Sequence, residues 1–416
     1  MPNTLIKNIK TLAGVQHRQQ ALRGAELAIL PQLQNAYLII EDDIIAEIGS
    51  MDNLSLAAKN IDEQVDATGC LVLPAWCDSH THLVFAASRE EEFVDKIKGL
   101  SYAEIAARGG GILNSARKLH LATEDQLFNQ AWQRLQEVAA LGTGAIEIKS
   151  GYGLSVEDEI KMLRVIKRLQ QKSSLAIKAT FLGAHTYPEQ YKEDHEAYIQ
   201  LIINDMLPVI AGEKLADYID VFCETGFFSA AETERICLAG MQYGLKPKLH
   251  ANQLNLSGGV EVGVKLKAVS VDHLETMDDA AIDTLAGSDT MGTLLPTAAF
   301  FLRMPYQPAR QLIDKGCAIA LATDFNPGSS PSGNMNLVVA LSCIQMKMLP
   351  EEAINAATIN GAFAMEVQHT HGSIAIGKKA NIILTKPIPG LAYLPYAFGA
   401  NNIQQVFING QPVRPL

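Results

Sequence analysis

The sequence predicts a (β/α)8 barrel with a small β-sandwich domain built from both ends of the chain. Three observations predict this fold. Apolar β-type runs alternate with helix-like stretches between residues 71 and 371. Short β-rich runs near the two termini resemble each other more than they resemble the middle. No GxGxxG turn follows the first strand, which disfavours an open dinucleotide-binding sheet.

The small domain is expected to comprise residues 1–70 and 372–416. The run AYLII (36–40) is of β type and is followed by an acidic turn. The same texture returns in NIILTK (381–386) and in IQQVFINGQPV (403–413), which contains an Asn-Gly turn of the kind that joins hairpin strands. We therefore expect both termini to fold together, with the middle of the chain inserted between them.

The middle of the chain, residues 71–371, is expected to form the barrel. Its β-type runs, in order, are LVLPAW, GAIEI, LAIKATF, IDVFCE, KPKLHA, AVSVDH, SDTMGTLL and AIALATD. Segments between them, such as VEDEIKMLRVIKRLQQK (156–172), have helical periodicity and mixed charge. Strands and helices that alternate in this way are typical of a closed parallel barrel, whose functional residues lie at the C-terminal ends of the strands.

Charge and hydropathy argue against two classes of partner. The formal net charge of -11 and the pI near 5.4 disfavour nucleic acid and anionic membrane as partners. No window approaches the roughly 18 apolar residues of a membrane-spanning helix, and the start of the chain lacks the apolar core of a secretory signal. We therefore expect a cytoplasmic protein whose main partner is neither nucleic acid nor a membrane.

Ionisable side chains follow most of the predicted strands. In PAWCDSHTHLVF (74–85), His80 and His82 share one face because alternate side chains of an extended strand point the same way. The other strand-end residues are Lys149, His185, Glu224, His250, His273 and Asp324. An unpaired buried polar group costs about 1–3 kcal/mol, and convergence on one metal ion removes this cost for several groups together.

His80, His82, His250 and Asp324 form a mixed nitrogen and oxygen ligand set that suits zinc or iron. We expect one divalent or trivalent ion with a position open to water. Such an ion lowers the pKa of water from about 15.7 toward 7 and polarises a carbonyl group under attack. Asp324 can then take the proton, and His273 can stabilise the oxyanion or relay a proton. This chemistry is hydrolysis, with a nitrogen leaving group in a small cyclic amide or amidine.

Longer motifs surround these residues along the whole predicted barrel. They are HTHLVFAASREEEF (80–93), GGGIL (109–113), IKSGYGL (148–154), FLGAHTYP (181–188), FCETGFFS (222–229), HANQLNLSGG (250–259), VDHLE (271–275) and ATDFNPGSSPS (322–332). With HTH followed by later His, His and Asp, they resemble the amidohydrolase superfamily and, within it, the imidazolonepropionases of histidine degradation. The resemblance implies a barrel of the metal-dependent amidohydrolase type, and it favours a homodimer.

The resemblance also implies an activity and a set of site residues. The activity is the hydrolysis of 4-imidazolone-5-propanoate, at a cyclic amide C–N bond, to N-formimidoyl-L-glutamate. The implied metal ligands are His80, His82, His250 and Asp324. The implied substrate contacts are Arg89, Tyr152, His185, Gln253, Asn326, Gly328 and Ser329. A propanoate tail needs a cationic partner, and the planar fork of Arg89 suits a carboxylate.

Some of these positions have a structural alternative. Arg89 can instead form a salt bridge with Glu90, Glu91 or Glu92, although neighbouring residues rarely face each other well. Tyr152 can be a packed core tyrosine, and the loop DFNPGSSPS is rich in turn formers and can be a plain connector.

Two positions depart from the expected pattern. Family members vary between Glu and Gln at the position of Gln253, and an amide cannot act as a base. Gln253 is therefore expected to take part by orienting the ring, with proton transfer left to Asp324 and His273. Ala75 stands where the superfamily usually has Gly, which is expected to shift the strand entry without touching the chemistry.

Three other functions stay open at this point. A cyclic-base deaminase can use the same barrel, but Arg89 and the NPGSS loop favour a substrate that carries a carboxylate. A binuclear cyclic amidase needs a carboxylated lysine, for which only Lys149 and Lys178 lie near inner strand ends. A non-enzymatic metal-dependent sensor would keep the pocket without turnover, although every expected ligand and proton carrier is present.

Overall fold

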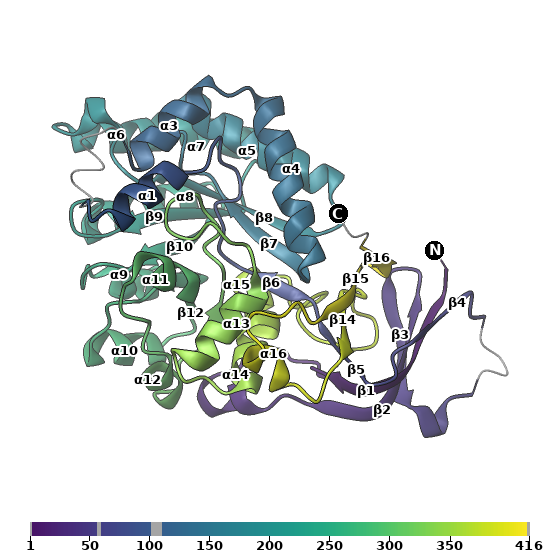
Figure 1. Ribbon diagram of the computed structural model, residues 1–416. Helices are drawn as coiled ribbons and strands as arrows, with labels where there is room; N and C mark the ends of the chain where they lie inside the picture. Colours follow the sequence, from purple (N-terminus) through teal and green to yellow (C-terminus); the bar gives the residue numbers. More distant parts are fainter. Residues whose placement is uncertain (1, 56–59, 101–109, 414–416) are drawn as a thin grey trace.

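The computed structural model describes residues 2–55, 60–100 and 110–413. Over these ranges the chain forms two eight-stranded sheets, and most of the helices surround one of them (Figure 1). None of the helices in the described ranges combines the length and the apolar character needed to cross a membrane. Gly109, the first residue of the GGG motif, lies outside the described residues.

The first sheet is the parallel barrel, and its strands follow one another in chain order. Its strands are β6 (Trp76–Asp78), β7 (Thr143–Lys149), β8 (Ala176–Ala184), β9 (Tyr218–Cys223), β10 (Lys246–Ala251), β11 (Ser270–His273), β12 (Met291–Leu294) and β13 (Ile319–Leu321). The ends of β6 and β13 meet through a parallel bridge between Thr81 and Phe325. The Asp324 amide donates to the His80 carbonyl at 3.0 Å across this seam. The closure of the barrel therefore places the HTH segment directly beside Asp324.

Helices lie around the outside of the barrel (Figure 1). They are α1 (Glu90–Ile97), α3 (Ile112–Leu121), α4 (Glu124–Ala140), α5 (Val156–Lys172), α6 (His195–Leu201), α7 (Leu207–Glu213), α8 (Ala230–Gln242), α9 (Gly259–Lys265), α10 (Asp279–Ala286), α11 (Pro296–Leu302), α12 (Ala309–Asp314), α13 (Met335–Ile344), α14 (Pro350–Asn355), α15 (Gly361–Ala364) and α16 (Tyr393–Tyr396). The structure confirms the helix predicted over 156–172. The Ser155 side chain caps α5, and its apolar stripe, including Leu163 and Ile166, is buried.

Short helical segments complete the chain. Three are 3-10 helices, η1 (Gly24–Ala28), η2 (Met51–Asn53) and η3 (Glu189–Tyr191), and two are π-helical, η4 (Ile202–Met206) and η5 (Ala356–Asn360). The π-helical segments join α6 to α7 and α14 to α15 without a break in the helical path.

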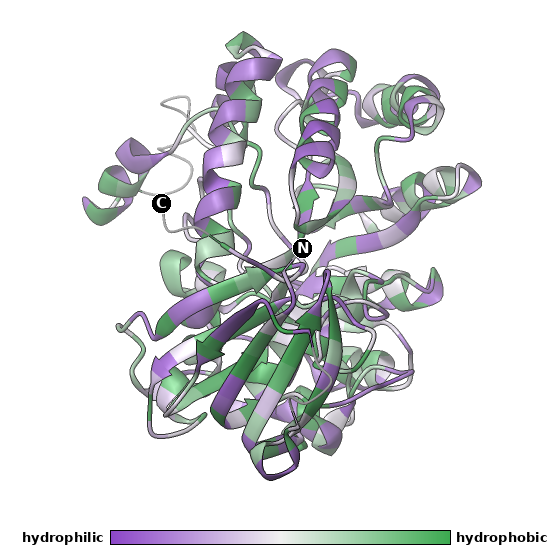
Figure 2. Ribbon diagram, turned by 90° about the vertical axis from the view of Figure 1, so that its right-hand side faces the viewer, coloured by the Kyte–Doolittle hydropathy of each residue, from purple (hydrophilic) through white to green (hydrophobic). Residues whose placement is uncertain are grey.

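The second sheet is built from both ends of the chain, as the sequence predicts. Its strands are β1 (Thr4–Ala13), β2 (Gln32–Glu41), β3 (Ile44–Ser50), β4 (Glu63–Asp66), β5 (Cys70–Pro74), β14 (Ile382–Pro387), β15 (Ile403–Ile408) and β16 (Gln411–Pro412). The N-terminal and C-terminal parts join where β14 pairs antiparallel with β5. The strands carry long hydrophobic stretches (Figure 2), and the buried residues among them form a core cluster of their own.

The structure differs from the sequence prediction at LVLPAW, which was expected to be the first barrel strand. The backbone changes sheets within this run, because the Ala75 amide donates to Asn381 in the terminal unit while the Trp76 amide donates to Gly142 beside β7. A continuous apolar run has the same pattern in either sheet, so periodicity does not reveal the change. The Cβ of Ala75 lies close to Gly144, where an added Cβ would come within 2.7 Å of it. The domain boundaries after residues 70 and 371 stay a prediction.

Candidate metal centre and substrate pocket

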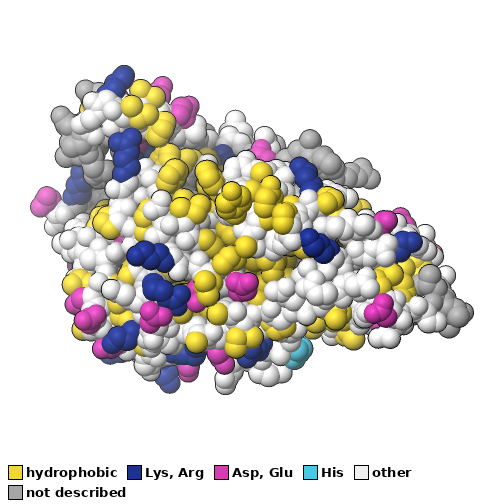
Figure 3. Space-filling model, turned by 60° about the horizontal axis from the view of Figure 1, so that its bottom comes forward, with side chains coloured by type: hydrophobic (Ala, Val, Ile, Leu, Met, Phe, Trp, Pro, Cys, Tyr) yellow, Lys and Arg dark blue, Asp and Glu magenta, His cyan; other side chains and the backbone are white. Residues whose placement is uncertain are grey.

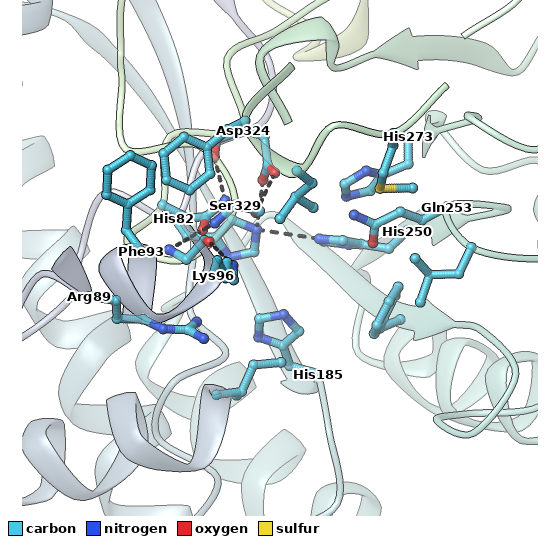
Figure 4. A pocket seen from close by; sticks show the side chains of 18 of the residues that line it. His82, Arg89, Phe93, Lys96, His185, His250, Gln253, His273, Asp324 and Ser329 are labelled. Atoms are coloured by element: carbon cyan, nitrogen blue, oxygen red, sulfur yellow. Dashed lines mark hydrogen bonds and ion pairs between the residues drawn. The ribbon is translucent and has the colours of Figure 1, made fainter. Parts of the chain in front are cut away.

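The predicted metal-binding residues lie together at the C-terminal end of the barrel. His82 Nε2 is 3.3 Å from His250 Nε2, and Asp324 Oδ1 is 3.5 Å from Nε2 of both His80 and His82. All four side chains are buried, and Figure 4 shows His82, His250 and Asp324 pointing toward one another. Donor atoms within 4.8 Å of one another form two overlapping groups, His80 with His82 and His250, and His80 with His273 and Asp324. The HTH residues lie just beyond β6 rather than within it.

The imidazoles of this cluster are held in the form that binds a metal ion. Burial is the largest cause that lowers the pKa of His80, His82 and His250 well below the usual value, so their rings are neutral. Carboxylates orient two of the rings, since Asp272 Oδ2 lies 2.7 Å from Nδ1 of His80 and Asp220 Oδ2 lies 2.9 Å from Nδ1 of His250. Their Nε2 atoms therefore carry the lone pairs that face the cluster.

The donor set fits a metal ion. His80 Nε2 is buried and has no hydrogen-bond partner among the described residues. A buried acceptor left in this state is costly, and coordination would satisfy it. Three neutral imidazole nitrogens and one carboxylate oxygen are ligands that zinc and iron both accept. The site can therefore hold a metal ion, and its residues do not distinguish the two elements.

Two residues of the cluster have a left-handed backbone, with φ of 87° at His273 and 53° at Asp324. His273 lies 3.3 Å from Glu275 Oε1. Burial alone lowers the pKa of His273, but the neighbouring charges and hydrogen bond, chiefly of Glu275, offset this and raise it to about 8. Burial raises the pKa of Asp324 to about 6, and its Oδ2 accepts a hydrogen bond from Ser329. The left-handed backbone of His273 and Asp324 is a strained conformation, and such conformations persist where the surroundings fix them, often at functional sites.

A cavity of about 700 Å³ opens beside the cluster. The predicted substrate contacts that line it are Arg89, Tyr152, His185, Gln253, Asn326, Gly328 and Ser329. Arg89, His185 and Gln253 are seen around it in Figure 4. The His185 ring stacks on His82 at 5.3 Å between centroids, and its Nδ1 bonds the Gly151 carbonyl at 2.9 Å. The seven residues therefore surround one space.

Arg89 forms the salt bridge that the sequence allows as an alternative, and it also lines the cavity. It forms a salt bridge with Glu92, in which Nε and Nη2 donate to Oε2 at 2.8 and 2.6 Å. The other oxygen of Glu92 accepts from the Gly111 amide and the Asn114 side chain, which ties the pair to the start of α3. Nη1 faces Gly328, where an added Cβ would lie 2.2 Å away. Glu92 therefore fixes the guanidinium and leaves one edge of it toward the cavity.

The loop after Asp324 is internally bonded rather than open. The amides of Gly328 and Ser329 both donate to Asn326 Oδ1 at 2.8 Å, and Asn326 Nδ2 donates to the Asp324 carbonyl at 2.6 Å. The backbone amides of Gly328 and Ser329, two of the substrate contacts that the resemblance implies, therefore already have a hydrogen-bond acceptor within the loop. The Asn326 side chain sets the shape of the loop and thereby the place of Ser329 beside Asp324.

Comparison with known proteins agrees with this site. The sequence profile of the amidohydrolase family matches residues 247–413. A protein of Flavobacterium johnsoniae named imidazolonepropionase is 59% identical over 98% of this chain and 99% of its own length. One of Clostridium tetani with the same name is 44% identical over 99% of this chain and 98% of its own length. The chain belongs to the imidazolonepropionase family.

Solved structures support the fold of this imidazolonepropionase family member. A 5-methylcytosine deaminase from Klebsiella pneumoniae has a TM-score of 0.74 at 16% identity and covers 99% of this chain and 98% of its own. An adenosine deaminase from Xanthomonas campestris with bound zinc has a TM-score of 0.67 at 15% identity, over 98% and 92% of the two chains. At these identities the likeness concerns the fold alone.

The two lysines weighed for a binuclear centre do not have the required environment in this imidazolonepropionase family member. Lys178 lies near the N-terminal end of β8, away from the C-terminal strand ends where the cluster lies, and pairs with Asp217 at 3.1 Å. Lys149 is buried, which by itself lowers its pKa, but the charges of Asp220, Glu147 and Asp272 raise it above the usual value. Carboxylation requires a neutral amine, so Lys149 is not suited to bridge two ions, and Lys178 lies at the wrong end of its strand.

Sequence reasoning missed several residues around the site. Asp220 and Asp272 hold the imidazoles of His250 and His80, and Glu92 holds Arg89. Glu224, counted among the strand-end residues, instead accepts from the amides of Leu254 and Asn255 and so shapes the loop that carries Gln253. For Asp220 and Asp272 the available signal was an acid inside an otherwise apolar strand run, since buried charges must be paired.

Proposed function

We infer that this chain hydrolyses 4-imidazolone-5-propanoate to N-formimidoyl-L-glutamate, a step of histidine degradation. The observation that carries this function is the full-length identity to proteins named imidazolonepropionase, together with a cavity that joins a metal-binding cluster to Arg89. The reaction adds water to the ring carbonyl and breaks its bond to the ring nitrogen. The carbonyl carbon becomes a carboxylate, and the nitrogen leaves as part of the formimidoyl group.

We propose that His80, His82, His250 and Asp324 hold one ion, zinc or iron. When bound, this ion supplies Lewis-acid activation of water and of the ring carbonyl. Asp324 accepts a proton from the attacking water, and its Oδ2 is held by Ser329 at 3.1 Å. His273, beside Asp324 and His80, stabilises the developing oxyanion and passes a proton toward the leaving nitrogen.

The pocket residues orient the substrate in this proposal. The free edge of Arg89 takes the propanoate carboxylate through charge-assisted hydrogen bonds. Tyr152 and His185, whose ring centroids are 5.5 Å apart, lie against the imidazolone ring, and the Gln253 amide hydrogen-bonds it. Gly328 lacks a Cβ and so leaves room for Arg89, while Asn326 and Ser329 fix the loop around the reacting group.

The experiment that tests this function follows the loss of imidazolonepropionate absorbance with purified protein whose metal content has been measured. Turnover that rises with the fraction of metal-loaded protein would support the proposal. Intact metal without turnover of this substrate would refute it. The deaminase alternative would release ammonia instead of opening the ring, so an ammonia assay on cyclic bases separates the two.

Arg89→Ala is expected to raise KM by about 10- to 100-fold with metal content unchanged. A hydrogen bond to a charged group contributes about 1.5–3 kcal/mol, and Arg89 lies outside the metal-binding cluster. Steady-state kinetics and metal analysis of the same preparation check this. Glu92→Gln is the matched companion, because it leaves Arg89 in place but weakens its support, and a smaller rise in KM is expected. Metal loss in Arg89→Ala would contradict the assigned role.

We also propose that the protein is a cytoplasmic homodimer without a nucleic-acid or membrane partner, as expected from its charge and hydropathy and, for the dimer, from the family resemblance. Hydrophobic side chains gather across the middle of the face seen in Figure 3, with charged side chains around them. Apolar surface of this kind is typical of permanent subunit interfaces. Light scattering coupled to size-exclusion chromatography is expected to give a mass near twice that of the chain, and a monomer would contradict it.

A further inference from the structure

Five charged side chains are completely buried next to the metal centre, and none of them lines the substrate cavity. They are Glu147, Lys149, Asp220, Lys248 and Asp272, each exposed by 1% or less. Burying a charge costs several kcal/mol unless partners compensate it. An array of this size inside the barrel therefore calls for an explanation beyond packing.

Lys149 is the centre of this array. Its Nζ lies 2.5 Å from Glu147 Oε1, 2.9 Å from Asp220 Oδ2 and 3.7 Å from Asp272 Oδ2. One ammonium group on β7 thus faces carboxylates from three different strands.

Two of these three carboxylates, those of Asp220 and Asp272, also contact the imidazoles of His250 and His80. Asp220 Oδ2 lies 2.9 Å from His250 Nδ1, and Asp220 Oδ1 also accepts from the His250 amide at 3.0 Å. Asp272 Oδ2 lies 2.7 Å from His80 Nδ1. In both aspartates the oxygen that faces Lys149 is the oxygen that faces the imidazole.

We propose that Lys149 is a positioning residue that sets the affinity of the metal centre by holding Asp220 and Asp272 against His250 and His80. This inference rests on the proposed metal site. Without the ammonium group, two buried carboxylates would face one another with no cation between them. At least one would then turn away, and its imidazole would lose the bond that aims Nε2 at the ion.

Lys248 provides a matched control inside the same array. It is equally buried, and it pairs with the same Glu147. Its Nζ also donates to the carbonyl groups of Ser79 at 2.9 Å and Ala364 at 3.2 Å, and it lies 5.5 Å from the centroid of the Tyr218 ring. In the described part of the chain its one carboxylate partner is Glu147, so it supports neither Asp220 nor Asp272. Removing either lysine disturbs a buried ion pair, but of the two only Lys149 contacts Asp220 and Asp272, the carboxylates that face the imidazoles.

The test compares Lys149→Met with Lys248→Met. Dissociation constants for Zn²⁺ and Co²⁺ are measured by competition with a chelator, and the visible spectrum of the Co²⁺ form reports ligand geometry. Both variants are expected to have a lower Tm. Lys149→Met is expected to bind metal about 10- to 100-fold more weakly with an altered Co²⁺ spectrum, as is typical when a group behind a ligand is lost. Lys248→Met is expected to keep the wild-type affinity and spectrum.

Unchanged affinity and spectrum in Lys149→Met, or an equal loss in Lys248→Met, would overturn the inference. If the single variants do not fold, each lysine change is combined with Glu147→Gln, which removes one buried charge of each sign in both cases. The pair K149M/E147Q and K248M/E147Q must then differ in metal affinity in the same direction. A wild-type protein that binds neither ion would refute the metal site itself, which distinguishes the two failures.

Discussion

His80→Ala is expected to lose both its metal ion and its activity. His80 is completely buried, its Nε2 faces Asp324 Oδ1 at 3.5 Å, and its Nδ1 is anchored on Asp272. Outer groups that only orient a ligand contribute about 10- to 100-fold in metal affinity, so a direct ligand should contribute more than 100-fold. Metal analysis after dialysis and the absorbance assay on the same sample measure both effects.

The control for this variant is His120→Ala. His120 is bonded to Asp158 on the outside of the barrel, and its side chain is 67% exposed, so it has no contact with the cluster. It is expected to keep its metal ion and its rate. A His80→Ala protein with full metal content would remove His80 from the ligand set. A His120→Ala protein that loses its ion would show that metal loss is not specific to the cluster.

His273→Ala is expected to keep its metal ion and to lose rate by a factor of roughly 10² or more, the usual range for a group that transfers protons in the transition state. The decrease should lie in kcat rather than in KM, because His273 acts on the reacting atoms and not on the propanoate tail. Steady-state kinetics on metal-loaded protein measure this.

His273→Asn is the matched variant, since φ at this position is 87° and Asn adopts a left-handed backbone more readily than Ala does. Agreement between the two variants in rate would assign the loss to the imidazole rather than to backbone strain. A near wild-type rate in His273→Asn would exclude His273 from the mechanism.

The sequence predicted the parts of the fold that depend on local pattern. The helix over 156–172 has a cap and an apolar stripe, and both are local features. The convergence of His80, His82, His250 and Asp324 follows from strand order, because the C-terminal ends of all strands of a closed parallel barrel meet at one face. The order of the strands is therefore sufficient to predict that histidines which follow strands far apart in the chain lie close together.

The remaining features depend on contacts that pattern does not encode. The switch of sheets at Ala75 depends on which backbone partner each amide finds, namely Asn381 or Gly142. The pairing of Lys149 with Asp220 depends on the side-chain directions of β7 and β9, which are not adjacent in the barrel. Both are set by tertiary structure.

The pairing of β5 with β14 has a consequence for biosynthesis. The two strands match Leu73 with Ile383, so more than 300 residues separate the partners along the chain. A nascent polypeptide leaves the ribosome from its N-terminus. The strand β5 therefore cannot pair with β14 until almost the whole chain has been synthesised. Closing such a long loop is entropically expensive and slow. During that time one edge of an apolar strand is open to other chains, which makes a protein cut short before β14 prone to aggregation.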